Sequence, residues 1–130
     1  MAATEEQPVI RHQAPCDEGW SEEGRGGVQW RTLFSGEHTP TRALTAGMAE
    51  IAPGDRLKAH RHAPPEIYHV LAGVGLVRVG EEEHRVEPGS SVFIPAHAVH
   101  GVHNTGRETL RFFYVFAADS FGEVDYDFQE

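Results

Sequence analysis

The chain has 130 residues, enough for one domain and too few for two independent cores. It carries 11 Lys and Arg against 20 Asp and Glu, a formal net charge of −9, and such a surface repels phosphate backbones and anionic headgroups. We therefore expect no nucleic-acid partner and no membrane surface. A hydrophobic share of 39% is sufficient for a folded core, and 14 Gly and 8 Pro indicate many turns between short elements.

Residues 1–27 mix acidic residues with Gly and Pro and have no sustained apolar period, which predicts an N-terminal arm or edge segment. This stretch lacks the apolar region of a secretory signal, and no run approaches the ~18 apolar residues of a membrane span, so we expect a cytoplasmic protein. Cys16 is the only cysteine. A disulfide within the chain and a Cys-based zinc site are therefore excluded.

Short strand-like runs alternate with Gly, Pro and Asn turns over residues 28–118. No stretch of twelve or more residues has an apolar stripe of helical period free of Gly and Pro. The pattern predicts an all-β barrel of two antiparallel sheets, a jelly roll with about eight or nine strands and room for a small ligand. Residues 119–130 alternate aromatic and acidic side chains, and we expect them to pack on the barrel or on a partner subunit.

Nine histidines are unusual for a domain of this size, and two of them are spaced for metal binding. His60 and His62 are two positions apart, so both imidazoles leave the same face of an extended backbone. The prolines at 64 and 65 bend the chain, after which the Glu66 carboxylate could face the pair and His100 could lie on a neighbouring strand. We predict one divalent transition metal, Fe, Mn, Ni, Co or Zn, bound by these four residues, with positions open to a small molecule.

Two segments resemble the signature motifs of the cupin superfamily. They read Gly54-(five)-His60-x-His62-(three)-Glu66-(six)-Gly73 and Gly89-(five)-Pro95-x-His97-(two)-His100-(three)-Asn104. The second motif departs only at His97, where a glycine is usual, and this departure puts the local turn geometry in question. The resemblance implies the cupin double-stranded β-helix and a metal held by His60, His62, Glu66 and His100.

Tyr68 follows Glu66 by two residues and is expected to point the same way, toward the metal. A phenol beside a cation can act as a general base or can simply line the cavity. The segments 27–30, 49–54, 65–68 and 121–126 are similar to small cupins that include the dimethylsulfoniopropionate lyases. That similarity implies β-elimination from a metal-anchored carboxylate to release dimethyl sulfide and acrylate, with Tyr68 as the base and Tyr126 as a second tyrosine at the pocket.

Two other functions stay open at this point. A cupin oxygenase or isomerase would bind a chelating substrate at the metal, with or without dioxygen, and a non-catalytic binding module or sensor would use the metal to hold a carboxylate ligand. Trp30, Met48, His97 and Tyr114 are further candidates for the pocket wall. Because small cupins commonly pair through their barrel edges, the resemblance also implies a homodimer.

Overall fold

Residues 6–12, 18–20 and 26–129 are described by this computed structural model, and they form eleven strands and one 3-10 turn, η1 (Phe121–Glu123). The strands are β1 (Glu18–Trp20), β2 (Val28–Phe34), β3 (Thr45–Ile51), β4 (Arg56–Arg61), β5 (Glu66–Ala72), β6 (Gly75–Val79), β7 (Glu82–Val86), β8 (Ser91–Ile94), β9 (His100–Asn104), β10 (Leu110–Phe116) and β11 (Asp127–Phe128).

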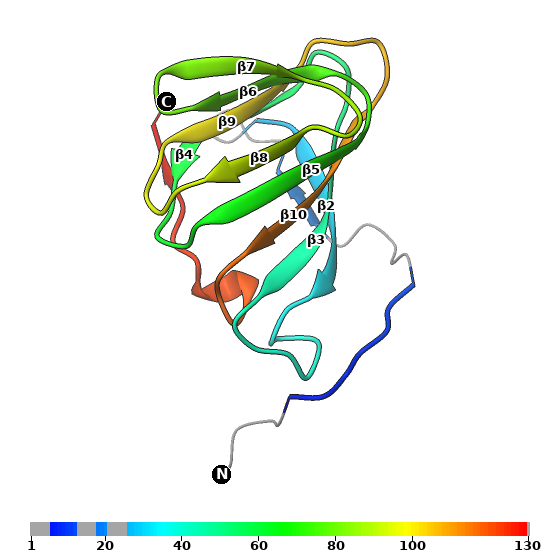
Figure 1. The fold of residues 1–130 in the computed structure, drawn as a ribbon, viewed down its shortest axis with the longest axis vertical. Helices are drawn as coiled ribbons and strands as arrows, with labels where there is room; N and C mark the ends of the chain where they lie inside the picture. Colours follow the sequence, from blue (N-terminus) through cyan, green and yellow to red (C-terminus); the bar gives the residue numbers. More distant parts are fainter. Residues whose placement is uncertain (1–5, 13–17, 21–25, 130) are drawn as a thin grey trace.

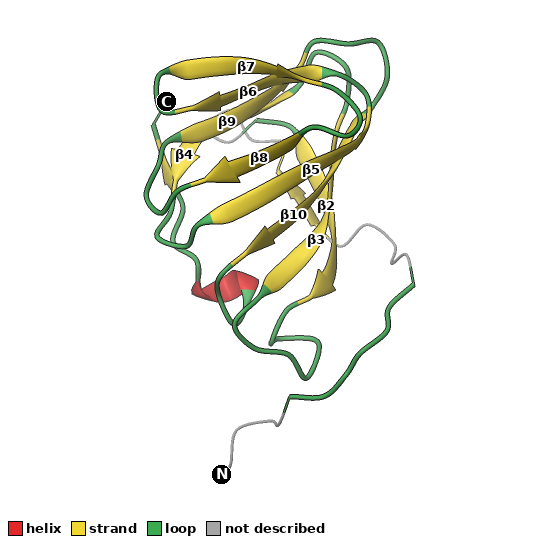
Figure 2. Ribbon diagram, viewed as in Figure 1, coloured by secondary structure: helices red, strands yellow, loops and turns green. Residues whose placement is uncertain are grey.

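All strand pairs are antiparallel, and the strands form two facing sheets (Figure 1). One sheet has the order β1-β2-β3-β10-β5-β8 and the other the order β11-β4-β9-β6-β7. Strands and loops make up almost the whole picture in Figure 2. The predicted all-β, two-sheet fold is therefore confirmed. In the described part of the chain, no helix is long and apolar enough to span a bilayer.

The strand count exceeds the expected eight or nine for a physical reason. β1 and β11 have three and two residues, too few to show an alternating pattern. β4 is interrupted by a register shift between Leu57 and His60, so its inward-facing residues are three apart and not two. Such a bulge hides a strand from any search for a period of two.

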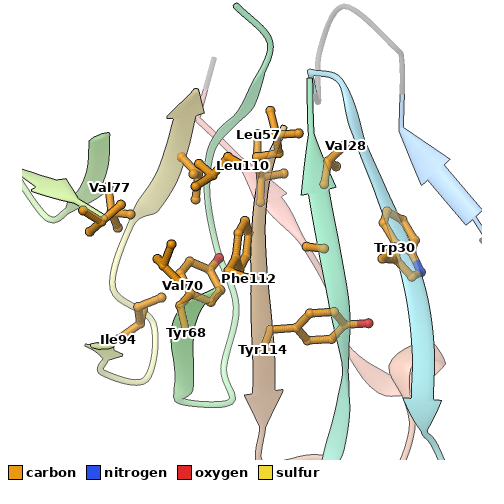
Figure 3. Packing of buried hydrophobic residues seen from close by; sticks show 14 of the residues in the cluster. Val28, Trp30, Leu57, Tyr68, Val70, Val77, Ile94, Leu110, Phe112 and Tyr114 are labelled. Carbon is orange, nitrogen blue, oxygen red and sulfur yellow. The ribbon is translucent and has the colours of Figure 1, made fainter. Parts of the chain in front are cut away.

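The core lies between the sheets, and β10 shows how the sequence builds it. Leu110, Phe112, Tyr114 and Phe116 are buried at every second position, while the residues between them are only half-buried. β10 pairs with β3 on one side and with β5 on the other, so these side chains lie at the centre of the larger sheet. Figure 3 shows three of them, Leu110, Phe112 and Tyr114. Burying each such side chain stabilises the fold by roughly 1.5–3 kcal/mol.

The first and the last strand each form one edge of a sheet. β1 pairs with β2, and β11 pairs with β4 through Asp127 opposite Arg61 and Phe128 opposite His60. The Gln129 amide donates to the Ala59 carbonyl at 2.9 Å. The C-terminal segment therefore lies along the strand that carries the first histidine of the motif, whereas Cys16 lies outside the described residues.

Candidate metal centre

Three strands deliver the four motif residues to one place between the sheets. His60 lies near the end of β4 and faces His100, the first residue of β9, in the strand register. Glu66 is the first residue of β5, after the proline bend that follows His62. The β4 bulge lets both Leu57 and His60 face inward, so the apolar core passes directly into the polar site.

The imidazoles of His60, His62 and His100 are buried, with 1%, 4% and 0% of their surfaces exposed. One ring nitrogen from each lies within 4.8 Å of the other two, a spacing that one metal ion can bridge. The ring centroids are 4.2 Å apart for His60 and His100 and 4.9 Å apart for His62 and His100. The structure thus brings these three residues together.

Backbone carbonyls fix the orientation of all three rings. Nδ1 of His60 lies 2.7 Å from the Lys58 carbonyl, Nδ1 of His62 lies 2.9 Å from the Pro64 carbonyl, and Nδ1 of His100 lies 2.9 Å from the Ala98 carbonyl. A carbonyl only accepts hydrogen bonds, so each Nδ1 carries the proton. Each Nε2 of the neutral ring is then a lone pair available to a metal.

Glu66 brings a carboxylate to two of these nitrogens. Its Oε1 lies 3.1 Å from Nε2 of His62 and 3.3 Å from Nε2 of His100, and the residue is 6% exposed. Burial alone raises the pKa of Glu66, but the adjacent imidazoles of His100 and His62 outweigh burial and hold this pKa below its usual range. A carboxylate facing lone pairs at these distances is stable only when a proton or a cation lies between them.

His60 completes the cluster as a neutral ring at neutral pH. Burial and the neighbouring His100 lower the pKa of His60 to about 3. Among the described residues, the buried Nε2 of His100 makes no well-aligned hydrogen bond, and its nearest charged neighbour is Glu66 Oε1 at 3.3 Å. Three imidazole nitrogens and one carboxylate oxygen, with no thiolate, are the donor set that divalent first-row metals accept, so these residues fit a metal.

A small cavity reaches the histidine cluster at His60. Its volume is about 40 Å³. Its walls include His60, Glu66 and four aromatic residues that were predicted from the sequence to lie at the site: Tyr68, Tyr126, Trp30 and Tyr114. Tyr68, Tyr114 and Trp30 lie on three strands of the larger sheet in Figure 3. Gly47 makes room for Tyr114, because a Cβ at this position would lie 2.6 Å from its hydroxyl oxygen.

The two tyrosines predicted to be catalytic line this cavity from opposite sides of the barrel. Tyr68 is 3% exposed and packs on Phe112, with the ring of His100 at 6.1 Å. Tyr126 comes from the C-terminal segment, with its ring 5.2 Å from that of His62. Burial, followed by the Glu66 charge, raises the pKa of both phenols well above 10, so both are neutral in the metal-free protein.

Two predicted pocket residues do not line the cavity. Met48 is buried, but Arg31 and Phe113 are its register partners, whereas Trp30 pairs with Ala49, so Met48 lies on the opposite face of the sheet. When both faces of a strand are covered, its apolar residues do not reveal which alternate positions face the cavity. Predicting Met48 as a pocket residue was therefore wrong.

His97 is exposed and also absent from the cavity wall. Its φ of 64° is left-handed, which explains why a glycine is usual at this position of the motif. The turn still closes onto the site, because the His97 amide donates to the His62 carbonyl at 2.9 Å. The backbone of His97 contributes to the site, whereas its side chain does not.

Several residues of the cavity wall were not predicted from the sequence. Phe121 stacks on Trp30 with ring centroids 5.1 Å apart, and it also lies 5.7 Å from Tyr126. The alternation of aromatic and charged residues in the C-terminal segment was the sequence pattern that indicated an inward-facing Phe121. Val28, Ala49 and Leu57 complete the apolar wall, and only the pairing of distant strands places them there.

The comparison with protein families agrees with this geometry. The cupin domain family matches residues 47–116, which include all three clustered histidines and Glu66. The chain belongs to the cupin family. A crystal structure of a protein from Thermotoga maritima, described as a predicted oxalate decarboxylase, has the same fold, with a TM-score of 0.73 and 26% identity over 85% of this chain and 99% of that chain.

Two relatives indicate different uses of the barrel. The dimethylsulfoniopropionate lyase DddW of Ruegeria pomeroyi is 43% identical over 103 residues, which cover 79% of this chain and 67% of that protein. The auxin-binding protein T85 of Nicotiana tabacum is 31% identical over 93 residues, 64% of this chain and 50% of that protein. The chain is thus similar to a catalytic cupin over most of its length, and to a binding protein over a shorter part.

Proposed function

We propose that this chain is a metal-dependent lyase that eliminates a cationic leaving group from the β-carbon of a small carboxylate, with dimethylsulfoniopropionate as the substrate. The observation that carries the proposal is that Tyr68, His60 and Glu66 line one cavity, in a chain 43% identical to a lyase of this name. Of the two relatives described above, the lyase is similar over the larger share of this chain.

The walls suit a substrate with an anionic end and a cationic end. His60, His62, Glu66 and His100 would hold the metal that receives the carboxylate. Beside the C-terminal segment, Phe121 presents an aromatic surface with the rings of Trp30 and Tyr126 each within 6 Å of its own ring. Aromatic faces attract a cation such as a sulfonium through the ring quadrupole, more strongly in a site with little water.

Bound at the imidazoles, a divalent cation would polarise the substrate carboxylate and, by its charge, favour the ionised form of a neighbouring phenol. Tyr68 is held by Phe112 and the β5 backbone beside this point. Its phenolate oxygen takes the proton from the carbon next to the carboxylate. The electron pair of that C–H bond forms the C=C bond, and the C–S bond breaks with its pair on sulfur, which leaves acrylate and neutral dimethyl sulfide.

Purified protein loaded separately with Fe(II), Mn(II), Ni(II) or Zn(II) tests the proposal. We expect release of acrylate and dimethyl sulfide in equal amounts without oxygen consumption. Tyr68→Phe should lower kcat by about 10²–10⁴-fold, since it removes the proton acceptor, while metal content stays unchanged. Tyr114→Phe is the matched control, because it also removes a buried phenol from the wall and should retain most of the activity.

The alternatives give different results in the same experiment. Oxygen uptake with a chelating substrate would point to an oxygenase. Binding of a carboxylate without turnover on any of the four metals would favour the small-molecule binding role suggested by the auxin-binding relative. Either result contradicts the lyase proposal and leaves the metal site intact.

A further inference from the structure

A second hollow lies on the outer face of the five-stranded sheet, on the opposite side of β4 and β9 from the histidines. It measures about 120 Å³ and opens where two features coincide. Gly101 of β9 has no side chain, and a Cβ there would lie 3.0 Å from the Leu57 carbonyl oxygen. The β4 bulge between Leu57 and His60 displaces the neighbouring backbone at this point.

Basic side chains surround this hollow. Arg56, Lys58, Arg78 and His103 line it, and Glu83 is the one acidic residue of the wall. The register explains this gathering, since Arg56 lies opposite His103, and Arg78 lies between Gly101 and Glu83 on adjacent strands. Three of the chain's 11 Lys and Arg therefore share one hollow of a protein whose net charge is −9.

These charges are not used within the fold. In the described part of the chain, the arginines in ion pairs are Arg31, Arg61 and Arg111, and no ion pair involves the basic side chains of the hollow. Arg78 donates from Nε to the Gly80 carbonyl at 2.7 Å, which orients its guanidinium and leaves the two terminal nitrogens for a ligand. Four basic side chains share the hollow with one carboxylate, that of Glu83, so a bound anion would offset the remaining repulsion between like charges.

We propose that this outer hollow binds a small oxyanion of the phosphate or sulfate class, either free or as the phosphate of a small ester. A guanidinium offers paired donors that match two oxygens of such an anion, and Lys58 adds a point charge beside it. The hollow has space for one such group. The acidic remainder of the surface disfavours a large polyanion, so the ligand is a solute and not a nucleic acid.

Titration of ¹⁵N-labelled protein with inorganic phosphate, at ionic strength held constant with sodium chloride, tests the proposal. We expect saturable shifts of the Arg78 amide on β6 and of the Glu83 amide on β7, a strand that carries no candidate metal ligand and pairs with β6. The double variant Arg56→Ala/Arg78→Ala should weaken binding at least tenfold. Arg107→Ala is the control, since Arg107 is exposed in the loop after β9 and lies outside the hollow, and it should change the affinity less than twofold.

Two further titrations distinguish the hollow from the metal centre, and a free anion from an ester. His60→Ala removes a candidate metal ligand and should leave phosphate binding at the hollow intact, so failure of the lyase proposal would not affect this result. Glycerol phosphate in place of inorganic phosphate shows whether an ester is accepted. The proposal is overturned if shifts at Arg78 and Glu83 are absent, persist in the double variant, or weaken equally in Arg107→Ala.

Discussion

At the scale of single residues, the second motif ends in a side chain that holds the fold together. Asn104 is 1% exposed, and its Nδ2 donates to the carbonyls of Ile51 and Glu108, both at 2.8 Å. Its Oδ1 accepts from the Gly106 amide at 2.9 Å. One amide therefore links the end of β3 to the loop between β9 and β10.

We expect Asn104→Ala to lower the free energy of unfolding by about 2–4 kcal/mol, because it leaves the buried Ile51 carbonyl and two part-buried backbone groups without their partner. Urea denaturation of the metal-free protein measures this change. Thr105→Ala, at the exposed neighbouring position, is the control and should have little effect. A loss below 1 kcal/mol for Asn104→Ala would show that water replaces the amide.

His60 makes the metal-free protein sensitive to acid. Its pKa is lowered to about 3 by burial and by His100, against 6.5 in the unfolded chain, so the unfolded state binds more protons between these values. Stability should therefore fall as pH drops from 6.5 toward 3. The depressed pKa of Glu66 acts in the same direction.

Each pH unit in this window costs about 1.4 kcal/mol per such group, so His60 alone should account for about 3 kcal/mol between pH 6.5 and pH 4. Urea midpoints of the metal-free protein at several pH values measure the slope. In His60→Gln the slope should be shallower, since glutamine does not titrate. An equal slope in both proteins would assign the acid sensitivity to other groups.

At the scale of elements, a short turn carries a side chain that its backbone disfavours. His97 has φ 64°, and a non-glycine residue in the left-handed region costs roughly 1–2 kcal/mol. The same turn positions β9, because Ala98 donates to the Pro95 carbonyl at 3.1 Å and accepts from His100. The turn thus bears strain three residues before His100, a candidate metal ligand.

We expect His97→Gly to stabilise the protein by about 0.5–1 kcal/mol, the relief of strain reduced by the greater freedom of glycine in the unfolded chain. His97→Ala removes the side chain and keeps the strained conformation, so this control should gain nothing. Thermal unfolding distinguishes the two variants. Equal gains from both would show that the imidazole, and not the backbone, was unfavourable.

The two motifs show how far sequence alone can reach. The spacing of His60 and His62 predicts a shared face correctly because β4 is extended beyond its bulge. The bulge itself cannot be predicted, since it depends on pairing with β9, more than forty residues away. The prediction for Met48 was wrong because residues on both faces of its strand are buried, so the sequence does not show which face points to the cavity. Phe121 was not predicted because its stacking on Trp30 depends on tertiary packing.

At the scale of the whole molecule, the cavity and its closing segment determine access to the site. A volume of about 40 Å³ holds one or two waters and not a sulfonium carboxylate. Phe121 and Tyr126 form the part of the wall that belongs to the C-terminal segment. The Tyr126 end of this segment is anchored on β4 by the two-residue β11 and an exposed Arg61–Asp127 pair. At the other end, the Phe121 amide donates to Ser35 Oγ at 3.2 Å and the Gly122 amide to Glu37 Oε1 at 3.1 Å. The rest of the wall lies mostly in strands of the core. The C-terminal segment is therefore the part that must yield to a substrate.

Amide hydrogen exchange tests this expectation. The Gln129 amide, bonded to Ala59, should exchange at least tenfold faster than the Val77 and Val102 amides of β6 and β9, because local opening of β11 breaks few contacts. Metal together with a short carboxylate inhibitor should slow exchange at Gln129 selectively. Uniform protection across β11 and β9 before any addition would contradict this picture.

The three carbonyls that hold the imidazole rings belong to Lys58, Pro64 and Ala98, and all three belong to the main chain. A scaffold of this kind cannot be lost by changing a side chain, since every amino acid supplies the same C=O. Substitutions at positions 58 and 98 should therefore spare the ligand geometry. The histidine cluster can therefore stay unchanged in related proteins while the aromatic residues of the cavity wall are substituted and the substrate changes.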